Sequence, residues 1–241
     1  KEDPEKLEQY AVELTKGIQQ ENELVVASDE SDFKEKAVDD AYWKLTEKMD
    51  LKKGGRKGSP KFPMPNVHES LLHFWDKSKL KRAFSSVRST LDNMANGGIY
   101  DQIGGGFARY ATDKAWLIPH FEKMLYDNAL LVSLLADVYK FTKKELYKET
   151  IEETLTYVKR EMLSNKGGFY AAQDADSESV EGKYYVWTKA EIDSILDKKA
   201  NLFCQFYDVT ENGNWEHNNI LWRKKSYEVF AKANNLDLNE F

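Results

Sequence analysis

The segment Gly97–Asn128, GGIYDQIGGGFARYATDKAWLIPHFEKMLYDN, decides how the rest of the chain is interpreted. Its first half combines five glycines with polar and aromatic side chains, and glycine permits backbone paths that other residues resist. Long loops of this composition are typical of functional sites that a rigid scaffold holds in place. The segment therefore predicts a ligand site; the alternative is an elaborate structural turn.

A helix is predicted to begin at Pro119 and to run to Phe141. His120, Lys123 and Asp127 would share one face of that helix, because they stand at helical spacing. The partly positive N-terminus of a helix can hold an anionic group, and a histidine there is a candidate general acid or base. In the structural alternative, His120 caps the helix and Lys123 pairs with Asp127 on the surface.

Other helices are indicated by apolar residues that recur at helical spacing between loops rich in glycine and proline. The predicted ranges are 4–20, 33–49, 69–77, 79–96 and 144–163, with capping boxes at Asp32/Glu35 and Thr188/Glu191. GGIY at Gly97 and GGFY at Gly167 each follow a helix and open a polar loop, and GNWEHNNIL after Asn212 is a degenerate third copy. Loops that repeat at this period gather on one face, so the pattern predicts an all-α fold whose loops form one cleft.

Three runs of sequence resemble one protein family: DQIGGGFARYATDKAWLIPHFEKMLYDNA, GGFYAAQDADSESVEGKYYVWT and GSPKFPMP. In this family, whose bacterial members are called YyaL-type and whose mammalian member is named for spermatogenesis, a thioredoxin-like domain precedes a helical toroid. That toroid is similar to those of N-acylglucosamine 2-epimerases and six-hairpin glycosidases. The resemblance runs from about Lys44 to Leu221 and implies a partial (α/α) toroid of helical hairpins. Residues 1–241 would then form a single, incomplete toroid domain, with the thioredoxin-like domain expected upstream and absent from this chain.

Composition excludes several classes of function. The chain has 35 basic and 41 acidic residues, and this balance disfavours nucleic-acid binding, which needs a basic face. No apolar run approaches membrane-spanning length, so no membrane partner and a cytoplasmic location are expected. Cys204 is the single cysteine, lies among apolar and aromatic neighbours and is expected to pack rather than react. Neither a metal nor a cofactor is expected, because the four histidines are scattered and no phosphate-binding loop is present.

Carboxylates form a second group of candidate residues. Asp174, Asp176, Glu178 and Glu181 crowd the run DADSESVEG, and Asp101 stands in the matching earlier loop. Two opposed carboxylates are what glycoside hydrolysis uses. An EF-hand is disfavoured, because counting from Asp174 the sixth position is not a glycine and the twelfth position, Tyr185, is not a glutamate, as such a calcium loop requires. In the structural alternative these acids bond loop amides and water.

The loops also carry the side chains expected to bind a substrate. Flat aromatic rings stack on sugar rings while charged groups bond the hydroxyls. The predicted binding residues are Arg109, Tyr110, Trp116, Glu122, Lys123, Tyr126, Asp127, Tyr170 and Trp187. The predicted function is catalysis on a small sugar ligand, either epimerisation through His120 or hydrolysis through Asp101 with Asp174 or Asp176. The alternative is a non-catalytic scaffold that presents ligands or proteins to the thioredoxin-like domain.

Overall fold

The computed structural model describes residues 3–22 and 34–237, which fall into two compact units, Lys1–Asp40 and Ala41–Phe241. The first unit holds helix α1 (Pro4–Asn22), which agrees with the predicted helix over 4–20. Helix α2 (Glu35–Glu47) begins in this unit and ends in the second. Asp32, the predicted capping residue of α2, lies outside the described residues.

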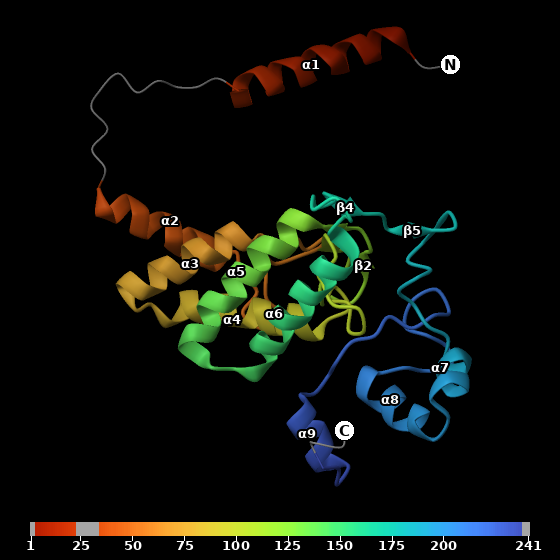
Figure 1. The fold of residues 1–241 in the computed structure, drawn as a ribbon. Helices are drawn as coiled ribbons and strands as arrows, with labels where there is room; N and C mark the ends of the chain where they lie inside the picture. Colours follow the sequence, from red (N-terminus) through yellow and green to blue (C-terminus); the bar gives the residue numbers. More distant parts are fainter. Residues whose placement is uncertain (1–2, 23–33, 238–241) are drawn as a thin grey trace. The chain divides into compact units, whose positions relative to one another are not determined.

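Two helical hairpins build the second unit (Figure 1). Helix α3 (Pro65–Ser78) is joined to α4 (Lys81–Asn96), and α5 (Leu125–Thr142) is joined to α6 (Glu145–Tyr157). Each connection is two residues long, and such short connections make consecutive helices antiparallel neighbours. The most extensive packing occurs within each hairpin, and α3 also packs on α5. The prediction of an all-α fold of helical hairpins is confirmed.

The two hairpin turns repeat one local structure. Lys79 ends α3 and Lys143 ends α5, each in a left-handed conformation, with φ of 57° and 52°. The preceding hydroxyl, of Ser78 or Thr142, accepts a hydrogen bond from the backbone N–H two residues later. This repeated turn lies at the C-terminal ends of α3 and α5. It is separate from the GGIY and GGFY repeat in the sequence.

The core of the second unit lies between these helices. Its side chains come from α3, α4, α5 and α6 and from the glycine-rich segment, including Leu71, Leu91, Ile99, Phe107, Trp116 and Leu135. Burial of so much apolar area is the main stabilising contribution to such a fold. The glycine-rich segment is therefore part of the core on one side and is free to carry polar groups on the other.

The segment between α4 and α5 is not helical before Leu125, so the prediction of a helix from Pro119 is wrong. Short antiparallel pairs occupy it instead: β1 (Tyr110–Ala111) pairs with β2 (Pro119–His120), and β3 (Lys123–Met124) pairs with β4 (Ala172–Gln173). Burial alternates from residue 119 to residue 124, which is the period of a strand rather than of a helix. His120 and Lys123 therefore do not share a helical face with Asp127.

The remaining elements lie before, within and after the loop that begins at Gly167. The α6 helix continues into a π-helical turn, η1 (Val158–Met162), and a hairpin joins β5 (Asp176–Ser177) to β6 (Val180–Glu181). Helix α7 (Lys189–Leu196), η2 (Asp197–Lys199), α8 (Ala200–Tyr207) and α9 (Tyr227–Ala233) complete the chain. The predicted capping box of Thr188 and Glu191 is confirmed at the start of α7. Cys204 is buried on α8.

Across residues 3–22 and 34–237, the helices are too short or too polar to cross a membrane.

Candidate functional site

The segment from Pro119 to Met124 separates two polar groups of residues. Pro119, Phe121 and Lys123 are buried, whereas His120, Glu122 and Met124 are partly exposed. Successive side chains of an extended segment point to opposite faces. The buried residues therefore face one cavity, and the partly exposed ones belong to a second, more open group.

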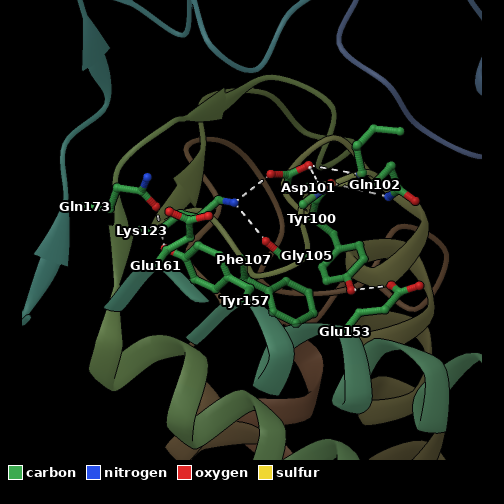
Figure 2. Close-up of polar contacts among 12 residues, drawn as sticks. Tyr100, Asp101, Gln102, Gly105, Phe107, Lys123, Glu153, Tyr157, Glu161 and Gln173 are labelled. Atoms are coloured by element: carbon green, nitrogen blue, oxygen red, sulfur yellow. Dashed lines mark hydrogen bonds and ion pairs between the residues drawn. The ribbon is translucent and has the colours of Figure 1, made fainter. Parts of the chain in front are cut away.

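Lys123 lies on the buried side, in the network that Figure 2 shows. Its ammonium donates hydrogen bonds to Asp101 Oδ2 and to the carbonyl oxygen of Gly105, both at 2.8 Å. The other carboxylate oxygen of Asp101 accepts from the backbone N–H groups of Ile103 and Gly104. Nearby, the hydroxyl of Tyr100 donates to Glu153 at 2.6 Å. Burial lowers the pKa of Lys123, while the neighbouring Asp101 carboxylate opposes that shift.

Asp101 and Lys123 form part of the lining of a cavity of about 260 Å³. Its walls are largely aromatic and aliphatic, and they come from all three repeated loops, through residues 98–104, 184, 185, 187, 220 and 221. Asp101, Lys123 and Trp187 are the predicted site residues that line it. The prediction that the GGIY and GGFY loops form one cleft is therefore confirmed for this cavity.

His120 belongs to the more open group. Its Nδ1 lies 2.7 Å from Glu181 Oε1, and its Nε2 lies 3.8 Å from Glu122 Oε2. The same Glu122 oxygen accepts a hydrogen bond of 2.8 Å from Arg109 Nη1. Glu181 comes from the β5–β6 hairpin, so the acidic DADSESVEG run does reach His120, through its last glutamate.

Aromatic rings continue this group away from the acidic hairpin. The ring of Tyr110 stacks on the imidazole of His120, with centroids 5.1 Å apart. On its other side Tyr110 contacts Phe62, at 4.7 Å between centroids. The three rings form a row that links the histidine to the proline-rich loop before α3.

A second cavity, of about 300 Å³, opens beside Phe62. The run 62–67 supplies an apolar wall, and Arg109, Tyr126, Asp127 and Leu130 supply the rest. Asp127 is 7% exposed, and burial raises the pKa of its carboxyl to about 6, against the effect of Arg109. Three predicted binding residues thus meet here: the cationic Arg109, the exposed Tyr126 and the nearly buried Asp127.

Several predicted roles are corrected by this geometry. Trp116 cannot stack on a ligand in this structure, because it is fully buried and its indole N–H donates to the carbonyl of Lys53. Lys123 pairs with Asp101 rather than continuing a face with His120 and Asp127. Lys123 turns inward because it lies in the extended β3, whereas Trp116 lies in a bend with a φ of 64° and packs in the core.

The predicted carboxylate pair is not assembled in either cavity. Asp101 lines the 260 Å³ cavity, whereas Asp174 and Asp176 are exposed and line neither of the two cavities. Asp174 Oδ1 instead accepts a hydrogen bond from the backbone N–H of Asp176, as the structural alternative expected of a loop acid. Tyr170 is exposed, and its role in binding stays a prediction.

Sequence reasoning missed two contributors to these sites. The proline-rich loop was used for its family resemblance, but Phe62 and its neighbours also form the wall of the 300 Å³ cavity. Tyr185 lines the other cavity and stacks on Phe121 at 5.6 Å. The available signal was composition alone, since Phe62 and Tyr185 are aromatic residues in the proline-rich loop and in the YYVW run.

No protein-family model matches the chain. The chain is 35% identical to human spermatogenesis-associated protein 20, over 82% of its own length and 29% of the human protein's. The mouse protein of the same name is also 35% identical, over the same shares of both chains. An uncharacterized protein of Caenorhabditis elegans is 36% identical, over 89% of this chain and 31% of the worm protein. The chain therefore spans less than a third of the length of these relatives.

Two solved structures are similar in fold, each at 19% sequence identity. The cellobiose 2-epimerase from Spirochaeta thermophila has a TM-score of 0.48, over 56% of this chain and 36% of that enzyme. A D-mannose isomerase has a TM-score of 0.41, over 47% of this chain and 29% of that enzyme. Both are α/α toroids, the fold predicted for this chain.

Proposed function

The chain belongs to the family of spermatogenesis-associated protein 20, and we propose that it carries out acid–base chemistry on a small sugar in the 300 Å³ cavity. The observation that carries this proposal is the position of Asp127, a nearly buried carboxyl between a cation and an apolar wall. A carboxyl whose pKa is raised toward neutrality by burial is a common feature of catalytic sites.

The chemical character of the cavity suits a hydroxylated ring. Phe62 and the prolines around it offer apolar surface to the face of a sugar, while Arg109 and Tyr126 offer polar groups to its hydroxyls. A cavity of about 300 Å³ lies at the lower end of the range for small-molecule sites. A monosaccharide, or one end of a disaccharide, is the ligand class that we assign.

Epimerisation or isomerisation of a sugar requires removal of a proton from the carbon beside a carbonyl group. In the proposed reaction the Asp127 carboxylate takes this proton from C2. Delivery of a proton to C1 then gives the isomer, and delivery of a solvent proton to the opposite face of C2 gives the epimer. Arg109 stabilises the negative charge that forms on the carbonyl oxygen, as a preorganised cation can. His120 lies outside the lining of the cavity, beside the Glu122 that Arg109 bonds, and in the proposed reaction it transfers a proton to and from sugar oxygens that extend past Arg109.

Proton exchange with solvent tests this proposal directly. The full-length protein is incubated in D₂O with D-mannose, D-glucose and cellobiose, and loss of the C2–H signal is followed by NMR. We expect exchange in at least one sugar, lost in Asp127→Asn and His120→Ala but retained in Asp137→Asn. Asp137 is a suitable control because it pairs with Lys140 on the surface of the same helix.

The binding-scaffold alternative predicts a different pair of results. A sugar would then raise the melting temperature of the protein without any exchange at C2. If none of the three sugars stabilises the protein and none shows exchange, both the catalytic and the sugar-binding forms of the proposal are contradicted. Hydrolysis through Asp101 with Asp174 or Asp176 is not favoured, because these carboxylates do not share a cavity.

The thioredoxin-like partner domain and the cytoplasmic location stay predictions.

A further inference from the structure

Within residues 3–22 and 34–237 two lysines are buried, and their surroundings are closely similar. Lys61 and Lys123 are each 2% exposed. Each donates a hydrogen bond to a backbone carbonyl, of Gly54 or Gly105, and each lies beside an aspartate. Each also lies over an aromatic ring, as cations commonly do when they are desolvated. Burial lowers the pKa of both ammonium groups.

The two lysines differ in what lies beyond the ammonium group. Lys123 lines the 260 Å³ cavity, whereas Lys61 lines none of the cavities described above. The rim of this cavity is open, because Ile103 is 58% and Tyr184 is 70% exposed. Lys61 fits a purely structural cation, but Lys123 lies at the floor of a space that a small molecule can enter.

We propose that Lys123 forms a reversible imine with a small aldehyde or ketone that enters the 260 Å³ cavity. A desolvated lysine in an apolar pocket is the usual nucleophile toward carbonyl compounds. The aromatic and aliphatic walls favour a ligand with an apolar part, and the volume limits it to a small one.

Asp101 supplies the proton transfers that the reaction needs. Its Oδ2, at 2.8 Å, takes one proton from the Lys123 ammonium and leaves a neutral amine. The amine lone pair attacks the carbonyl carbon, and the resulting carbinolamine loses its oxygen as water, using the proton that Asp101 held. Ammonium and carbonyl compound thereby give a protonated imine and water, with no oxidant or reductant consumed.

The environment of Lys123 suits the product as well as the reactant. A protonated imine keeps the positive charge, so its ion pair with Asp101 is retained. The charge also stays over the rings of Tyr157 and Tyr185, whose centroids lie 4.3 and 4.8 Å from Nζ. The hydrogen bonds and rings that hold the ammonium therefore do not oppose the reaction.

This inference does not depend on the proposed sugar chemistry. Lys123 and Asp101 line the 260 Å³ cavity, whereas Asp127 and Arg109 line the 300 Å³ cavity. Loss of proton exchange at a sugar carbon would leave imine formation at Lys123 unaffected, and the converse also holds.

Reductive trapping tests the proposal on the native full-length protein. The protein is treated with a limiting amount of propanal and sodium cyanoborohydride, which reduces an imine to a stable secondary amine. Peptide mass spectrometry then measures the modified fraction of every lysine. We expect Lys123 to be modified several-fold more than Lys61, which lines none of the described cavities, and more than the exposed lysines, because burial lowers the pKa of Lys123 and so favours the free amine. Butanone added as a competing ketone should reduce propyl labelling at Lys123, because its own trapped product has a different mass.

Protein unfolded in urea is the control, and all lysines should then react alike. The proposal is overturned if native Lys123 is modified no more than Lys61, or no more than the exposed lysines. It is also overturned if the preference for Lys123 survives in urea, because the cavity is then irrelevant. Asp101→Asn should slow trapping at Lys123, and the wild-type comparison of Lys123 with Lys61 stands even if that variant does not fold.

Discussion

Replacing Asp127 by asparagine is expected to stabilise the protein at neutral pH while removing the proposed proton exchange with a sugar. The Asp127 carboxyl is 7% exposed, and Arg109 only partly offsets the effect of burial on its ionisation. Asparagine keeps the size of the side chain but carries no charge. Residues in active sites commonly lower the free energy of unfolding, because function and stability place different demands on the side chain.

The magnitude follows from the pKa of this carboxyl. Burial raises the pKa from 3.8 to about 6. Because the folded-state value is raised, the stabilising contribution of the protonated form is fully present below pH 3.8 and is lost as the pH rises through 6. At 1.36 kcal/mol per pKa unit, the ionised carboxylate lowers the free energy of unfolding by about 3 kcal/mol above that range.

Urea unfolding measured from pH 3.5 to pH 8 is a suitable assay, with Asp137→Asn as the matched surface control on the same helix. The Asp127→Asn variant and the wild type should be about equally stable near pH 3.5. Above pH 6.5 the variant should be more stable by about 2 to 3 kcal/mol, and Asp137→Asn should show no such trend.

Two results would refute the reasoning. The first is a difference between Asp127→Asn and the wild type that does not change with pH. The second is a wild type that gains stability over the variant as the pH rises. That outcome would mean that Arg109 stabilises the carboxylate more than burial destabilises it.

Three further experiments test the packing of the chain, two by substitution and one by labelling. Asn128→Leu should lower the free energy of unfolding by about 2 to 4 kcal/mol in urea, because this buried amide holds the backbone of the glycine-rich segment; an effect below about 0.5 kcal/mol would contradict that role. Gly182→Ala should destabilise more than Gly167→Ala, since both have positive φ but an added Cβ meets the Phe121 ring at 2.4 Å only at Gly182; equal effects would rule out the clash. Cys204 should react slowly with a thiol reagent in the native state, because burial raises its pKa, and rapid native labelling would show that it is accessible.

Local patterns in the sequence were sufficient for most of the predicted helices. The ends of α3, α4 and α6 with its π-helical turn differ from the predicted ranges by a few residues, whereas α5 begins at Leu125 and not at Pro119. The capping box at Thr188 was expected from its spacing to Glu191 and is formed. Helix formation depends on hydrogen bonds and side-chain contacts within about four residues, so a single sequence carries most of this information.

The site was predicted in part. Repetition of the GGIY and GGFY runs indicated that their loops meet, and residues of both line the 260 Å³ cavity. The composition of the segment indicated Arg109, Tyr126 and Asp127, which line the other cavity. The sequence could not show that these residues fall into two separate cavities, because that division depends on the direction of each side chain.

Only the tertiary structure decided the conformation of the segment from Pro119 to Met124. Helical and extended spacing both fit so short a stretch, and the extended form is stabilised by a partner distant in the sequence, since Lys123 pairs with Gln173. In this extended segment Lys123 bonds Asp101, while His120, which pairs with Tyr110, reaches Glu181. The sequence thus determined the helical hairpins and the residue types at their loops. Contacts between distant segments determined which of those residues are buried, which are paired and which line a cavity.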